Sequence, residues 1–93
     1  MKVYGEAAVA RFARRHPASR KALQRFLEIT KQAAWPSFVA VKRTFAATDY
    51  VSGRLIFDVG GNKYRVIAKV DFTDQSLLVE SILTHEEYDR ESF

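Results

Sequence analysis

Cysteine is absent from this chain, and histidine is scarce, with two residues among 93. The absence of thiols excludes a disulfide framework and cysteine-based catalysis. Two histidines are too few for a typical zinc site, which usually takes several Cys or His ligands. Neither a glycine-rich phosphate loop nor a nucleophile elbow occurs. We therefore expect no metal ion and no cofactor.

Long hydrophobic runs are missing too. The longest apolar stretches fall far short of the roughly 20 residues that a membrane span requires. The first residues also lack the apolar core of a signal peptide. The composition, with 47% hydrophobic and 13% aromatic residues, is that of a globular protein. We expect one domain over residues 1–93, located in the cytoplasm and without a membrane partner.

Charge is distributed unevenly along the chain. Residues 1–53 hold ten Lys or Arg against three acidic residues, a net +7, whereas residues 54–93 hold five against eight, a net −3. A basic half is typical of proteins that meet a polyanion or an acidic partner, although a solvated pair of cationic helices would give the same count. Charge alone does not identify the partner.

The first half of the chain has the period of helices. Residues 1–4 predict a short strand, and two helices follow over about residues 5–15 and 19–33. A short third helix, with Pro36 in its first turn, is predicted to continue to Phe45. His16-Pro17 ends the first helix because the residue before a proline leaves the α region. Ser19 is the expected N-cap of the second. The first two helices are expected to cover one face of a sheet.

From Arg54 onward the period changes to two, the repeat of a β-strand. Residues 60–62, Gly-Gly-Asn, accept positive φ and predict a tight turn between two strands. A second turn at 73–75 and an alternation of Leu77, Val79, Ser81 and Leu83 complete a three-stranded antiparallel meander. The predicted fold class is α+β, with N-terminal helices packed on a curved antiparallel sheet.

The strand after the first turn has two different faces. Its apolar row, which includes Tyr64, is expected in the core, and its other row carries three cations, Lys63, Arg65 and Lys69. A purely structural alternative is that these cations lie on a polar, solvent-exposed outer face of the sheet. Trp35, too, is expected in the core rather than as a platform for bases.

The segment 84–89, Thr-His-Glu-Glu-Tyr-Asp, predicts a short C-terminal helical turn. Thr84 and Glu87 have the spacing of a capping box, and His85 takes no part in that motif. A helix N-terminus favours neutral imidazole, whereas the neighbouring acids favour imidazolium, so both protonation states of His85 stay open.

Two motifs occur in order in under 100 residues: Gly61-Asn62-Lys63-Tyr64-Arg65-Val66-Ile67, preceded by Arg54-Leu55-Ile56-Phe57, and Thr84-His85-Glu86-Glu87-Tyr88-Asp89. Together they resemble the HigB-type toxins, small RNases of the RelE-like superfamily from bacterial type II toxin-antitoxin pairs. The likeness extends to His16-Pro17, Ala34-Trp35, Val41-Lys42, Phe45 and Asp49, and so covers nearly the whole chain.

The resemblance implies a RelE-like fold and a toxin that cleaves mRNA on the translating ribosome. It also implies a helix-turn-helix antitoxin that holds the toxin inactive and represses the operon of the pair. Without this antitoxin, no direct binding to DNA is expected.

Metal-independent RNA cleavage needs a base for the 2′-hydroxyl, a cation for the phosphate and an acid for the departing 5′-oxygen. Lys63 and Arg65, two apart on one strand, are the candidates for gripping the phosphate. His85 is the candidate for proton transfer, because histidine changes charge near neutral pH. These three are the predicted catalytic residues. The predicted RNA contacts are Asn62, Lys69 and Tyr88, of which the last would stack on a splayed base.

A function of another class fits the same composition. The chain would then be a non-catalytic RNA-binding module, or an inactive relative that only pairs with its antitoxin. An enzyme should lose cleavage but keep binding when His85 becomes alanine. A binding module has no cleavage to lose and should respond chiefly to removal of Lys and Arg.

Overall fold

The computed structural model describes residues 1–90. In chain order its elements are β1 (Lys2–Tyr4), α1 (Glu6–Arg15), a 3-10 turn η1 (Pro17–Ser19), α2 (Arg20–Gln32), α3 (Phe38–Thr44), β2 (Thr48–Val51), β3 (Arg54–Val59), β4 (Tyr64–Asp71), β5 (Ser76–Thr84) and α4 (His85–Arg90). The predicted α+β class is therefore confirmed.

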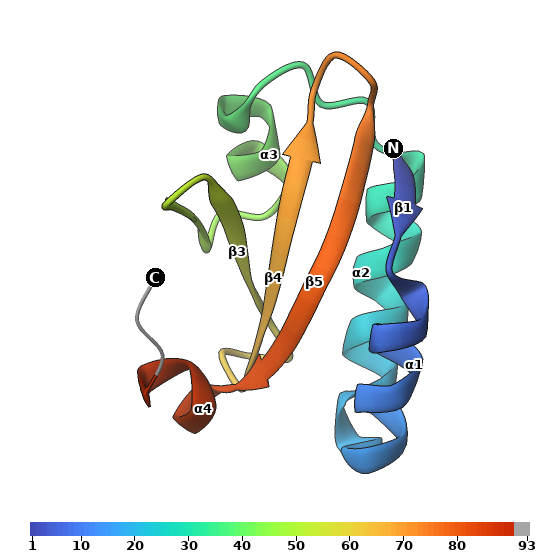
Figure 1. Cartoon of the computed structure of the whole chain (residues 1–93), viewed down its shortest axis with the longest axis vertical. Coiled ribbons are helices and arrows are strands. Elements are labelled where there is room, and N and C mark those ends of the chain that lie inside the picture. The colour runs from blue at the N-terminus through green and yellow to red at the C-terminus, as the bar shows by residue number, and fades with distance from the viewer. Residues whose placement is uncertain (91–93) are drawn as a thin grey trace.

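All five strands form one sheet in the order β1-β5-β4-β3-β2 (Figure 1). Strands β2 to β5 are an antiparallel meander, and β1 is parallel to β5 at the opposite edge. The meander thus has four strands, where three were predicted. The missed strand, β2, joins β3 through Ser52 and Gly53, which both have positive φ. Its central residues Asp49 and Tyr50 are exposed, as on many edge strands, so no apolar alternation marks it.

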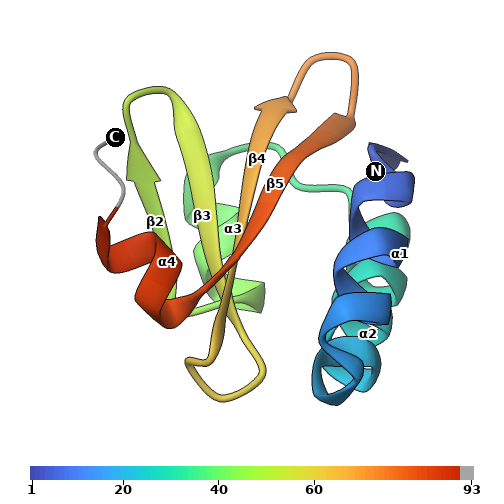
Figure 2. The same cartoon turned by 60° about the horizontal axis from the view of Figure 1, so that its bottom comes forward.

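Helices α1 and α2 lie side by side against one face of the sheet (Figure 2). Their inner stripes are buried with the inward rows of β3, β4 and β5 in one apolar cluster. Tyr64 and Trp35 belong to this cluster, which confirms the prediction that both are core residues. None of the helices within residues 1–90 is long and apolar enough to cross a membrane.

The junction between α1 and α2 differs in one detail from the prediction. His16 is the C-cap of α1, and its ring stacks on that of Phe12 with 4.3 Å between centroids. Ser19 precedes α2 as predicted, but its hydroxyl does not cap that helix. It donates instead to the carbonyl of His16 at 2.7 Å, because the Pro17–Ser19 turn already gives Ser19 a helical backbone.

The turn at 60–63 carries the predicted conformation, with φ of 65°, 63° and 75° at Gly60, Gly61 and Asn62. The closing pair of the hairpin is Val59 with Tyr64. Lys63 is consequently the last residue of the turn, and the prediction that placed it on the strand beside Arg65 is wrong by one residue.

A bulge in β5 changes the face on which its later residues lie. Ile67 pairs with Ser81 and Ala68 with Val79, so Glu80 has no residue opposite it on β4. One extra residue moves every later side chain to the other face. Ile82 therefore enters the apolar cluster, and the predicted alternation through Ser81 and Leu83 is wrong.

Candidate functional site

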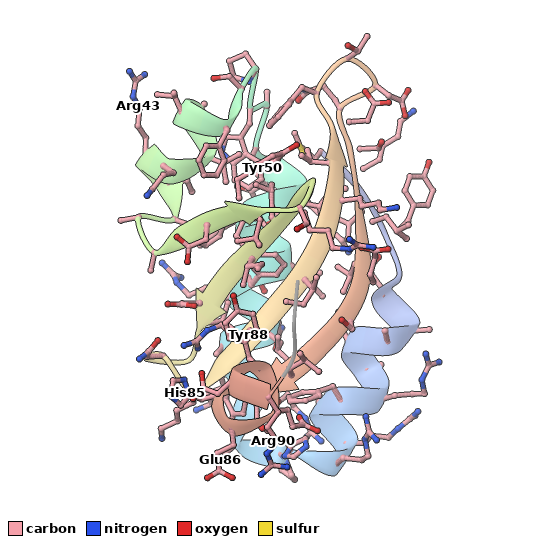
Figure 3. All side chains as sticks on the ribbon, turned by 60° about the vertical axis from the view of Figure 1, so that its left-hand side comes forward. Arg43, Tyr50, His85, Glu86, Tyr88 and Arg90 are labelled. Carbon is pink, nitrogen blue, oxygen red and sulfur yellow. The ribbon has the colours of Figure 1, made fainter. Side chains whose placement is uncertain are left out.

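Helix α4 leaves the end of β5 and folds over the sheet face opposite α1 and α2. Figure 3 shows His85, Glu86, Tyr88 and Arg90 gathered there, with Arg43 at the other end of the molecule. The backbone N–H of His85 donates to the carbonyl of Lys63 at 2.8 Å. The start of α4 is thereby attached to the turn that precedes β4.

A capping box fixes the first turn of α4, as predicted. The N–H of Thr84 donates to Oε1 of Glu87 at 2.8 Å, and the N–H of Glu87 donates to the Thr84 hydroxyl at 3.2 Å. The first of these bonds lowers the pKa of Glu87 below its usual value, since it stabilises the ionised carboxylate. The orientation of His85 therefore follows from the Thr84–Glu87 pair.

Arg65 is the centre of the site and is buried, with 7% of its surface exposed. Its Nε lies 2.7 Å from Oδ1 of Asp58, the residue directly opposite it on β3. One terminal nitrogen donates to the carbonyl of Asn62 at 3.0 Å. The alternative explanation, a solvent-exposed polar face, does not hold at this position, because Asp58 and the turn backbone fix the guanidinium within the fold.

The other terminal nitrogen of Arg65 lies 2.9 Å from Nδ1 of His85. A guanidinium can only donate, so Nδ1 must present its lone pair. The imidazole proton then sits on Nε2, which is 3.2 Å from Oδ2 of Asp89 one helical turn onward. In this geometry Nδ1 accepts from Arg65 and Nε2 faces Asp89, the arrangement of the Nε2–H tautomer.

Tyr88 lies on the same guanidinium. The Cζ atom of Arg65 is 5.4 Å from the centroid of the Tyr88 ring, a distance at which a cation is attracted to an aromatic face. Tyr88 is half-buried.

The fold brings five of the six predicted site residues together: Asn62, Lys63, Arg65, His85 and Tyr88. The side chains of Asn62 and Lys63 are exposed on the turn. Lys69 is separate from them. It lies four residues along β4 from Arg65, about 13 Å at the usual rise of a strand, and its ammonium is 3.9 Å from Oε2 of Glu80.

The site also contains two acidic residues that were not predicted as part of it, Asp58 and Asp89. The length of the turn could have revealed Asp58, because closing the hairpin at Val59 and Tyr64 puts Asp58 opposite Arg65. The i,i+4 spacing of His85 and Asp89 on a helix was also visible. Both carboxylates act on other side chains of the site, Asp58 on Arg65 and Asp89 on His85.

The arrangement combines an unprotonated imidazole nitrogen with a fixed cation and, beside them, an exposed lysine. Such a set can accept a proton and stabilise a phosphate anion at the same place. Within residues 1–90, no group of three or more His, Asp or Glu side chains is placed to hold a metal ion.

A family model described as HigB_toxin, RelE-like toxic component of a toxin-antitoxin system, matches residues 19–91. The chain belongs to the HigB toxin family. This confirms the resemblance found in the sequence.

Two relatives illustrate how far the likeness reaches. The mRNA interferase toxin HigB of Escherichia coli K12 is 38% identical over 53 residues, which cover 54% of this chain and 51% of that protein. The mRNA interferase HigB of Escherichia coli O6:H1 is 29% identical over 93 residues, 97% of this chain and 90% of that protein. The chain thus spans about half the length of the first relative and most of the second.

Proposed function

We propose that this chain is the toxin of a type II toxin-antitoxin pair and an endoribonuclease that cleaves mRNA. Membership of the HigB toxin family and the names of its relatives support this proposal. The observation that carries it is the 2.9 Å contact between Arg65 and Nδ1 of His85, which holds a proton acceptor against a cation.

The reaction begins with the exchange of one hydrogen bond. An incoming phosphate competes for the terminal nitrogen of Arg65, since a guanidinium binds an oxyanion more strongly than a neutral ring nitrogen. Nδ1 of His85 is then free to take the proton of the 2′-hydroxyl, whose oxygen attacks phosphorus while the bond to the 5′-oxygen breaks. The 5′-oxygen leaves with a proton from water, which reaches the site because the His85 side chain is 48% exposed.

The other residues of the site have supporting parts. Asp89 stabilises the imidazolium that forms when Nδ1 takes the proton. The buried Arg65 acts as a fixed charge, and the exposed Lys63 is the cation that moves onto the phosphate. Asn62 and Tyr88 flank the bound phosphate and contact the RNA. Lys69, farther along β4, attracts the RNA strand by its charge. No step requires a metal ion.

The setting of the reaction belongs to the same proposal. The toxin acts in the cytoplasm on mRNA that is being translated by the ribosome, and a helix-turn-helix antitoxin keeps it inactive. The resemblance of the two sequence motifs to HigB-type toxins supports these points.

Primer extension on a reporter mRNA in a reconstituted translation system tests the proposal. The wild type is compared with Lys63→Ala, Arg65→Lys and His85→Ala, each with and without ribosomes. Lys42→Ala, on the exposed face of α3, is the control. We expect cuts only during translation, fading in the three site variants and persisting in the control.

The absence of cuts under both conditions, with folded protein, would reject the enzyme and favour the RNA-binding module. Cuts without ribosomes would reject the ribosome requirement alone.

A further inference from the structure

Three arginines of α1, Arg11, Arg14 and Arg15, line a hollow of ≈ 310 Å³ on the surface. All three are exposed. Their spacing of three and four residues places them on one face of the helix. At a rise of 1.5 Å per residue, Arg11 and Arg15 are separated by about 6 Å along the helix axis. We refer to this feature as the arginine hollow.

The ion pairs of the described residues do not account for these charges. Among residues 1–90 the ion pairs are Lys31–Glu6, Arg54–Glu80, Arg65–Asp58, Lys69–Glu80 and His85–Asp89, and none includes an arginine of the hollow. Like charges four residues apart destabilise a helix. The helix dipole favours Arg14 and Arg15 in the last turn of α1, but it gives no reason for Arg11, one turn earlier.

The arginine hollow and the candidate site belong to opposite faces of the sheet but to the same end of the molecule. In Figure 1, the C-terminal end of α1 and helix α4 lie toward the same end of the molecule. The pKa of Glu87 is lowered chiefly by the hydrogen bond from Thr84, and further by the positive charges of His16 and Arg15. The end of α1 is thus within electrostatic reach of the first turn of α4, which carries His85.

We propose that the arginine hollow binds backbone phosphates of the RNA strand, next to the nucleotides that occupy the site of Lys63, Arg65 and His85. This inference rests on the proposed function, because the RNA strand that occupies the catalytic site is the one that continues across α1. The guanidinium group of an arginine can donate hydrogen bonds to two phosphate oxygens at once, and all three cations of the hollow are arginines.

An acidic protein segment fits the hollow less well. Protein interfaces have an apolar core, with charges at the rim. Among residues 1–90, arginines alone line the arginine hollow, so no apolar side chain of this described part of the chain anchors a peptide there. A chain of phosphates requires no such anchor, since its affinity comes mainly from neutralised charge.

Fluorescence anisotropy of a labelled, single-stranded RNA tests the proposal. The double variant Arg11→Gln/Arg15→Gln is compared with Lys42→Gln/Arg43→Gln, which removes the same charge on α3 at the far end from His85 (Figure 3). Binding is measured in a His85→Ala background, so that the probe stays whole, and circular dichroism confirms folding. For two lost phosphate contacts, the slope of log K against log salt should become shallower by about 1.4 in the hollow variant only.

Equal slopes in the two double variants would overturn the proposal. So would an unchanged RNA affinity in the hollow variant combined with a loss of binding to a labelled oligoglutamate, which would assign the hollow to an acidic partner. Cleavage is followed separately with His85 intact. If the slope changes as expected but no protein cuts RNA, the proposed function fails and the phosphate site stands.

Discussion

At the scale of single residues, the site depends on which groups hold Arg65. Asp58 and the carbonyl of Asn62 fix the guanidinium from one side, and His85 and Tyr88 contact it from the other. A buried charge with fixed partners keeps its geometry while a substrate arrives, which is the condition for electrostatic stabilisation of a reacting phosphate.

Asp58→Asn should destabilise the protein and weaken cleavage together. The side chains of Arg65 and Asp58 are 8% and 25% exposed. We expect a loss of about 2 kcal/mol in the free energy of unfolding, below the 3–5 kcal/mol found when a fully buried pair is broken. Urea denaturation measures the loss. The control is Glu80→Gln, which affects the more exposed pairs with Arg54 and Lys69 and should cost at most about 1 kcal/mol. Equal losses would show that Arg65 does not depend on Asp58.

Asp89→Asn should slow cleavage and leave RNA binding unchanged. An amide cannot balance the charge of an imidazolium, and we expect a rate about 10-fold lower under single turnover, a modest effect because solvent screens an exposed carboxylate. The Asp89 side chain is 59% exposed. Glu86→Gln, in the same helix, removes an equal charge and serves as control. A rate unchanged by Asp89→Asn would remove this residue from the mechanism.

At the scale of elements, the turn at 60–63 sets the position of Lys63 and the start of β4. Gly60 and Gly61 both have positive φ, but only at Gly60 would a Cβ meet another group, the Tyr64 ring at 2.8 Å. The two glycines are therefore a natural pair for separating backbone strain from steric clash.

Gly61→Ala should cost about 1–2 kcal/mol from the left-handed backbone alone. Gly60→Ala should cost a further 1–3 kcal/mol or so, because the buried Tyr64 ring must move. Thermal unfolding gives the difference. The displaced ring should also shift the NMR signals of His85, through Lys63, in Gly60→Ala only. Equal stabilities would mean that the ring yields freely.

Helix α4 should loosen at low pH. The pKa of Glu87 is lowered by the hydrogen bond from Thr84, so the folded protein holds this carboxylate ionised more readily than the unfolded chain does. The stabilisation is therefore complete above the unfolded value near 4.5 and is lost as pH falls through the lower folded pKa. Amide exchange of Thr84 and Glu87 should accelerate in this range. Glu87→Gln should abolish the dependence, and Glu86→Gln should preserve it.

The elements also show why the sequence predicted most of the fold but not all of it. Helices, the turn at 60–62 and the capping box are local patterns, and the structure confirms them. The parallel pairing of β1 with β5 joins distant residues, and no local pattern encodes it. The bulge at Glu80 breaks the two-residue period without a glycine to mark it. Asp58 belongs to the site because the register of the β3–β4 hairpin places it opposite Arg65, and this register follows from the length of the turn and not from a sequence motif.

At the scale of the whole molecule, an aromatic cluster couples the helices to the sheet. The Phe57 ring, fully buried, lies 4.9 Å from the ring of Phe26 on α2 and 5.5 Å from that of Phe45 after α3. Trp35 stacks on it at 6.5 Å. The cluster lies in the core beneath the helices, whereas Arg65 and His85 lie on the other face of the sheet, so stability and catalysis can be separated here.

Phe57→Ala should lower the free energy of unfolding by about 3–5 kcal/mol, since it leaves a cavity at a point where three segments meet. Val39→Ala, at a side chain that is 60% exposed, is the control and should change little. Chemical denaturation measures both. At a temperature where Phe57→Ala remains folded, its cleavage rate per folded molecule should equal that of the wild type. A selective loss of activity would connect the cluster to the site.

The parallel pair of β1 and β5 has a consequence for the order in which the protein folds. Lys2 pairs with Ser76 and Tyr4 with Leu78, so this pairing joins residues 74 positions apart in the sequence. Closing so long a loop is slow, because its entropy is lost before the contact forms. The same late strand, β5, carries His85 to Arg65. The strand that closes the sheet against β1 is therefore also the strand that completes the site.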